Sequence, residues 1–94
     1  MKAFQRKGEM NEMTRFLKDE KIILKNLPAE FKWIARDENG DLNVYLTKPL
    51  KCIRKGYWES DNFTSINLFK NLFRAISWED KDPVSILEIV GGKL

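Results

Sequence analysis

The segment Phe31–Pro49 constrains the fold of this chain more than any other. Two runs with apolar residues at every second position flank the dipeptide Asn39-Gly40. Such alternation places successive side chains on opposite faces of a β-strand, and glycine adopts a positive φ at little cost. Asn-Gly between two alternating runs is the strongest short-range signal for a hairpin. The sequence therefore predicts a β-hairpin over residues 31–47, at the centre of the fold.

The alternation also predicts which side chains share a face of this hairpin. On the first strand, one face carries Phe31, Trp33 and Ala35. On the second strand, one face carries Leu42, Val44 and Leu46. We expect the face with Phe31 and Trp33 to pack on the apolar face of a helix that bears Phe69 and Phe73, and this contact to form the core.

Two shorter strands are predicted after the hairpin. Lys48-Pro49 ends the second strand of the hairpin, because an interior proline would remove a ladder hydrogen bond. Residues 50–54 and 57–59 follow as two strands, joined by a turn at Lys55-Gly56. The neighbouring aromatic residues of the last strand, Tyr57-Trp58, then point to opposite faces, so we expect one of them to be exposed.

Two helices are predicted in the last third of the chain. Over residues 66–76 the apolar positions recur at helical spacing, and Ser65 is a candidate N-cap; these positions are Ile66, Phe69, Leu72, Phe73 and Ile76. Asp82-Pro83 is typical of a helix start and Gly91-Gly92 of a helix end. The inner face of this second helix is expected to carry Val84, Leu87 and Val90.

The amino-terminal part has a weaker pattern. After a loose arm over residues 1–8, one helix face from Glu9 to about Glu20 carries Met10, Met13, Phe16 and Leu17, whereas Ile22-Ile23 favour extended chain. This amphipathic helix either packs on the rest of the domain or offers its apolar face to a partner. The predicted organisation is an arm and helix over residues 1–26 and a compact domain over residues 27–94. The expected fold class is α+β: a small antiparallel sheet built on the 31–47 hairpin, with one or two helices on one face.

Composition excludes several kinds of chemistry. The 94 residues include no histidine, which excludes Ser-His and Cys-His nucleophile pairs and removes the usual zinc ligand. The single Cys52 excludes an intramolecular disulfide and any metal site with several cysteines. The acidic residues Glu79, Asp80 and Asp82 are interpreted as a solvated turn rather than a magnesium site. We therefore expect a protein that is not an enzyme and that has no metal or cofactor.

Membrane insertion and export are also not expected. No apolar run approaches the roughly 18–20 residues that span a bilayer. The basic amino terminus is not followed by an apolar stretch, as a signal peptide would be. We expect a cytoplasmic protein without membrane partners.

The clearest candidate binding surface is a basic stretch beside two aromatic residues. It consists of Lys48, Lys51, Arg54 and Lys55, without an intervening acid, followed by Tyr57 and Trp58. A basic sheet surface with an aromatic platform suits single-stranded nucleic acid, because cations meet phosphates while bases stack. Arginine and aromatic residues also form the centres of protein–protein interfaces, and a basic edge can simply prevent strand-to-strand aggregation. Of the two binding interpretations, protein binding is favoured, since the formal net charge is only +3.

One resemblance to known proteins covers residues 27–90. It begins with Asn26-Leu27-Pro28 and continues through Lys32-Trp33-Ile34-Ala35-Arg36-Asp37-Glu38-Asn39-Gly40. It includes Tyr57-Trp58 and ends with Leu72-Phe73 and Ile76-Ser77-Trp78-Glu79-Asp80. In this combination the chain resembles short proteins encoded by phages and prophages of Gram-positive bacteria. The resemblance implies a phage accessory protein that acts in the cytoplasm of the bacterial host, and it supplies no catalytic residues.

Two functions are expected on these grounds. The first is a non-catalytic phage-encoded accessory protein that binds a host or defence protein through its sheet or its amino-terminal helix. The alternative is a nucleic-acid-binding accessory protein that uses the basic stretch over residues 48–55 with Tyr57 and Trp58. The identity of the partner and the oligomeric state stay open at this point.

Overall fold

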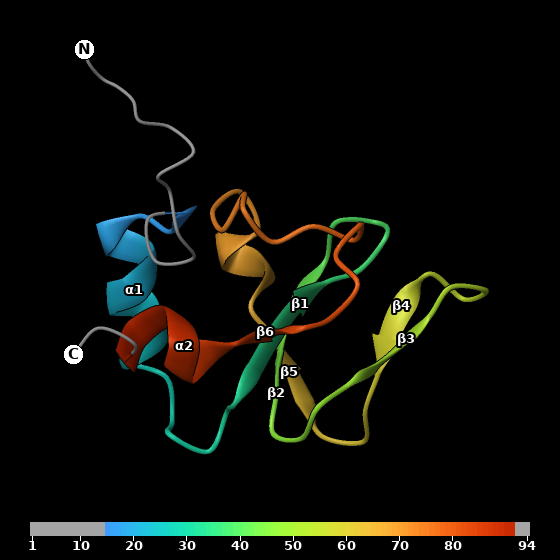
Figure 1. The fold of residues 1–94 in the computed structure, drawn as a ribbon, viewed down its shortest axis with the longest axis horizontal. Helices are drawn as coiled ribbons and strands as arrows, with labels where there is room; N and C mark the ends of the chain where they lie inside the picture. The colour runs from blue at the N-terminus through green and yellow to red at the C-terminus, as the bar shows by residue number, and fades with distance from the viewer. Residues whose placement is uncertain (1–14, 92–94) are drawn as a thin grey trace, which may run out of the picture.

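The computed structural model of the chain describes residues 15–91. The predicted fold class is confirmed: the described part is α+β, with antiparallel strands and two α-helices (Figure 1). The elements in chain order are α1 (Lys18–Lys25), β1 (Trp33–Arg36), β2 (Leu42–Tyr45), β3 (Leu50–Cys52), β4 (Tyr57–Glu59), β5 (Phe63–Ser65), the 3₁₀ helix η3 (Asn67–Phe69), β6 (Val84–Ser85) and α2 (Ile86–Gly91). Neither α-helix has the length and apolar character to cross a membrane.

The predicted hairpin is confirmed as the pair β1 and β2, which runs from Trp33 opposite Tyr45 to Arg36 opposite Leu42. Gly40 in its turn has a φ of 97°, the left-handed conformation that Asn-Gly predicted. The hairpin is the middle of a four-stranded antiparallel sheet with the order β5-β2-β1-β6. The strands β3 and β4, also predicted, form a separate two-stranded sheet.

The four-stranded sheet is covered on both faces, so the expected single core is wrong. On one face Ile34, Leu42 and Val44 pack with Phe73 and with the helices α1 and α2. On the other face Ala35, Tyr45 and Trp33 pack with Trp58 of β4 and with Trp78. Trp33 and Phe73 therefore belong to different cores. The reason is that the β3–β4 hairpin folds back over the face that was expected to meet a helix.

The helix predicted over residues 66–76 is also wrong. In its place lie the end of β5, the short helix η3 and a series of turns. Phe73 has a φ of 58°, which no residue of an α-helix adopts. Ile66, Phe73 and Ile76 are nevertheless buried. The apolar spacing therefore correctly indicated which residues are buried, but it did not indicate a helix. Ser65 does accept a hydrogen bond, from the backbone N–H of Asn67 at 3.2 Å, but only the short 3₁₀ helix η3 follows.

The carboxyl-terminal helix begins later than predicted. Val84 and Ser85 form β6, with Ser85 opposite Trp33 of β1, and α2 starts at Ile86. The Ser85 hydroxyl accepts a hydrogen bond from the N–H of Glu88 at 3.3 Å, which is the capping role predicted for Asp82. Because the helix begins at Ile86, its buried face carries Ile86 and Ile89, and Leu87, which was expected to be buried, is exposed. Gly91 still lies in α2 and is the last described residue, so the helix end predicted at Gly91-Gly92 falls at the limit of the described part.

The first described helix, α1, overlaps only the end of the helix predicted from Glu9; residues 1–14 lie outside the described part. The expectation of extended chain at Ile22-Ile23 is wrong, because both residues lie in α1. Glu20 stabilises the start of α1, since its carboxylate accepts the N–H of Leu17 at 2.9 Å. Leu24 is buried in the same core as the hairpin, so α1 packs on the rest of the domain.

Candidate functional site

Trp58, one of the six residues predicted to form a binding surface, is part of the interior. Only 4% of its surface is exposed, and its ring packs against Ala35 and Tyr45. Its indole N–H donates to the carbonyl of Arg36 at 3.1 Å. Its neighbour Tyr57 points the other way and is 40% exposed, as alternation along a strand predicted. Trp58 therefore cannot serve as a stacking platform for a ligand.

Lys51 is likewise occupied by internal contacts. Its ammonium donates to the carbonyls of Trp78 and Asp80, the latter at 2.8 Å. It lies 4.4 Å from the centroid of the Trp78 ring and 5.4 Å from that of Trp58. These contacts tie β3 to the turn over residues 77–80 and make Lys51 a structural cation.

The other members of the basic stretch lie apart from this interior pair. The Lys48 ammonium lies 5.4 Å from the ring centroid of Trp33, which faces the second core. Arg54 is exposed in the turn between β3 and β4. Lys55 bonds the carboxylate of Glu59 at 3.2 Å and lies 5.8 Å from the Tyr57 ring centroid. The structure does not bring the six residues together as one basic and aromatic surface.

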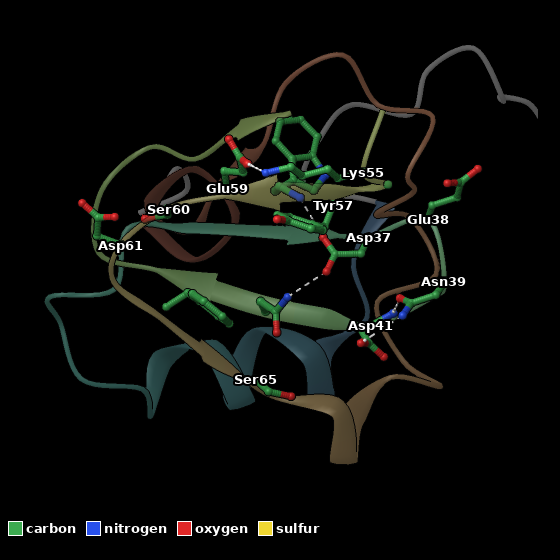
Figure 2. A pocket seen from close by; sticks show the side chains of 14 residues that line it. Asp37, Glu38, Asn39, Asp41, Lys55, Tyr57, Glu59, Ser60, Asp61 and Ser65 are labelled. Carbon is green, nitrogen blue, oxygen red and sulfur yellow. Dashed lines mark hydrogen bonds and ion pairs between the residues drawn. The ribbon is translucent and has the colours of Figure 1, made fainter. Parts of the chain in front are cut away.

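A groove of about 1060 Å³ lies between β4, β5 and the loop that joins β1 to β2 (Figure 2). Among residues 15–91, its charged lining consists of five carboxylates and one lysine: Asp37, Glu38, Asp41, Glu59, Asp61 and Lys55. Clustered charges of one sign in a concave site focus the local field. The groove is therefore strongly negative, although the chain as a whole carries a formal net charge of +3.

The floor of the groove is a buried polar network. Asp37, which is 9% exposed, accepts the backbone N–H of Trp58 at 3.0 Å and the side-chain amide of Asn43 at 3.3 Å. The same amide nitrogen lies 3.4 Å from the hydroxyl of Tyr45. Burial raises the pKa of Asp37, although the hydrogen bond from Trp58 opposes this shift. Burial also raises the pKa of Tyr45 to about 12, so its hydroxyl stays protonated at neutral pH.

The walls of the groove carry two exposed aromatic side chains. Phe63 on β5 is 55% exposed, and its ring centroid lies 5.9 Å from that of Tyr45. On the opposite wall, Tyr57 carries the Lys55–Glu59 ion pair beside its ring. The hydrogen bond to Glu59 is the main reason that the pKa of Lys55 is raised. The walls thus combine carboxylates with ring faces, both of which attract cations.

Sequence reasoning missed this groove because its members come from separate segments. The sequence showed Asp37 and Asp41 only as polar residues of a hairpin turn, Glu59 as the end of a predicted strand, and Asp61 as a loop residue. The fold-back of β4 brings the two sets together. Within residues 15–91 no group of three acidic or cysteine side chains is placed to hold a metal ion.

The buried Asp37 predicts a pH dependence of stability. Because its pKa is raised in the folded protein, the folded state binds this proton more tightly than the unfolded chain does. Its contribution to the free energy of unfolding is therefore greatest below about pH 4, the ordinary aspartate pKa, and is lost as the pH rises through the raised value. We expect the stability of the wild type relative to Asp37→Asn to fall as the pH rises from about 4 toward neutrality. Urea unfolding of both proteins at a series of pH values measures this difference.

The control for this measurement is Glu30→Gln, which removes an exposed carboxylate outside the groove. Its stability relative to the wild type is expected to stay nearly constant over the same pH range. A constant difference for Asp37→Asn as well would contradict the assignment of the titrating group to Asp37.

Comparison with known proteins supplies no relative from which a function could be transferred. No protein-family model matches the chain, and no curated protein or solved structure matches it significantly.

Proposed function

We propose that this chain is a non-catalytic binding protein that takes a positively charged segment of a partner protein in its acidic groove. The observation that carries the proposal is the lining of the groove, with five carboxylates and a single lysine around about 1060 Å³. A concave site of this charge attracts cationic ligands and accelerates their association. Proteins present such ligands as lysine and arginine side chains.

The exposed rings on the groove walls support the same proposal. Tyr57 and Phe63 are both exposed, and aromatic side chains dominate the binding energy of many protein interfaces. The ring of Tyr57 already lies beside one cation, the ammonium of Lys55. A lysine or arginine of a partner could make the same kind of contact with a ring while it pairs with a carboxylate.

A nucleic-acid partner is less well supported. The groove repels phosphates, and two of the residues expected to bind nucleic acid, Lys51 and Trp58, are engaged inside the protein. Among the residues of the predicted basic stretch, the cations that remain exposed are Lys48, Arg54 and Lys55, and Lys55 is already paired with Glu59. The one exposed aromatic ring beside them, that of Tyr57, lies on the wall of the acidic groove, so these cations and this ring do not form a separate basic surface.

The class of partner rests on the resemblance to phage-encoded proteins. A protein of this kind acts inside a bacterial cell, so a host or defence protein with a basic segment is the proposed target. The positive charge of the bound segment is inferred from the carboxylates of the groove, whatever the origin of the chain.

The test uses the full chain and a short end-blocked peptide in which serine and arginine alternate, at about 150 mM salt. The groove variant Glu59→Gln/Asp61→Asn is expected to bind this peptide about three- to tenfold more weakly than the wild type, the effect of removing two exposed ion pairs. The matched control is Glu30→Gln/Glu79→Gln, which changes the charge equally but outside the groove. Fluorescence anisotropy of the labelled peptide measures all three affinities.

Lys55→Gln provides a change in the opposite direction. It removes the one cation that the described part of the chain places in the groove, and it frees Glu59, so the variant should bind the basic peptide more tightly than the wild type. Equal losses in the groove and control variants would contradict the proposal, because binding would then follow the total charge alone. Tight binding of a single-stranded oligonucleotide that Lys55→Gln abolishes would support the nucleic-acid alternative.

A further inference from the structure

The floor of the groove holds a hydrogen-bond acceptor that the described residues do not satisfy. Asn43 is only 6% exposed and lines the groove. Its amide nitrogen lies within bonding distance of the Asp37 carboxylate and the Tyr45 hydroxyl. A carboxylate can only accept, so these contacts fix which end of the amide is nitrogen. Its oxygen, Oδ1, receives no donor from residues 15–91, and buried acceptors without a donor are rare in proteins.

We infer that this floor binds the guanidinium group of an arginine in the partner segment. The inference rests on the proposed function and names the side chain that the groove selects. Guanidinium carries five N–H donors in a planar fork and no acceptor. Such a fork can satisfy Asn43 Oδ1 and the remaining acceptor capacity of Asp37 together. The group is also more weakly hydrated than an ammonium, so transferring it to a nearly buried floor costs less than transferring the head of a lysine.

The register of β2 and β5 leaves a path by which an arginine side chain can reach Asn43. Asn43 lies opposite Ser65 of β5, which is exposed and has a small side chain (Figure 2). The next pair along the strands is Tyr45 and Phe63, whose rings fill the corresponding space. A long side chain can therefore reach Asn43 by passing over Ser65 from the open edge of β5, with the ring of Phe63 alongside for stacking.

The experiment compares three end-blocked peptides on the full chain. In them serine alternates with arginine, with lysine, or with citrulline, a neutral side chain of nearly the same shape as arginine. The arginine peptide is expected to bind about tenfold more tightly than the lysine peptide, as bidentate charge-assisted hydrogen bonds favour the fork. Citrulline should bind most weakly, because it lacks the charge. The side-chain amide resonances of Asn43 should shift with the arginine peptide and not with the lysine peptide.

Two substitutions on one strand locate the arginine. Ser65→Leu fills the path to Asn43, so the variant should lose the preference for arginine and bind both peptides with the affinity of the lysine peptide. Thr64→Leu is the matched control, because Thr64 is also exposed but lies on the opposite face of β5. It should keep the preference unchanged. Circular dichroism checks whether both variants keep the wild-type fold.

The outcomes separate this inference from the proposed function. Equal affinities for arginine and lysine peptides in the wild type would overturn the inference and leave the proposed function intact. A preference for arginine that survives Ser65→Leu would also overturn it, because the arginine would then bind elsewhere. Failure of both cationic peptides to bind would overturn the inference and the proposed function together.

Discussion

Replacing Arg36 with methionine is expected to lower the free energy of unfolding by about 3–4 kcal/mol, because it leaves several partly buried carbonyls without donors. The guanidinium of Arg36 donates five hydrogen bonds of 2.8–3.0 Å to backbone carbonyls, those of Gly40, Lys70, Leu72, Phe73 and Ile76. This one side chain therefore organises the turns over residues 70–76, which have little regular structure of their own. Urea unfolding of the variant measures the loss.

Two further variants isolate the cause. Arg74→Met removes the same charge from an exposed position near Arg36, and it should change stability little. Arg36→Lys keeps the charge but has three donors in place of five, so it should recover less than half of the lost stability. A full recovery with lysine would contradict the role assigned to the five hydrogen bonds, since charge alone would then be sufficient.

Replacing Glu20 with alanine is expected to cost about 2–4 kcal/mol, because two backbone N–H groups lose a charged acceptor in the interior. One carboxylate oxygen of Glu20 accepts the N–H of Leu17 at 2.9 Å and the other accepts the N–H of Phe73 at 2.6 Å. The side chain is 2% exposed and thus links the start of α1 to the turns that Arg36 holds from the other side. Thermal unfolding measures the cost.

The matched control is Asp19→Ala, which removes an exposed carboxylate from the same first turn of α1. It should lose only the small helix-dipole contribution, typically below about 1 kcal/mol. In Glu20→Ala, hydrogen exchange at the Phe73 amide should also become faster, as that donor loses its acceptor. Equal losses in the two variants would show that Glu20 acts only through the charge of the helix start.

The part of the fold that the sequence predicted is the part encoded by neighbouring residues. Alternation and Asn39-Gly40 specify β1, β2 and their turn within a single stretch of chain. The false helix over residues 66–76 shows the limit of this reasoning. There, the apolar residues are spaced as in a helix because they are buried, not because the segment is helical. Backbone carbonyls of the segment accept hydrogen bonds from Arg36, which lies more than thirty residues earlier in the sequence. A contact between residues so far apart in the chain produces no periodic pattern in the sequence from which it could be predicted.

The candidate site was beyond prediction for a related reason. Lys51 and Trp58 were predicted to bind a ligand because a lysine and a tryptophan are each common in binding surfaces. In the structure they lie opposite each other on β3 and β4, and Trp58 is buried in the core with Ala35 and Tyr45. The acidic groove, in contrast, exists only once β4 has folded over the hairpin and brought Asp61 near Asp37. The loop over residues 37–41 is acidic by itself, but nothing in the sequence places Glu59 and Asp61 beside it, so the groove appears only in the structure.

The hairpin turn also affects the rate at which this protein is deamidated. Asn-Gly is the dipeptide in which the glycine nitrogen most readily attacks the asparagine side chain, a reaction that ends in deamidation. Here the N–H of Gly40 donates to the carbonyl of Asp37 at 2.9 Å, and the side chain of Asn39 accepts the N–H of Asp41 at 2.9 Å. Both reacting groups are thus restrained, and deamidation requires the turn to open, so its rate reports local unfolding of the hairpin. Because Asn39 borders the groove, each such event adds a carboxylate to it, and an old sample would present a more acidic groove than a fresh one.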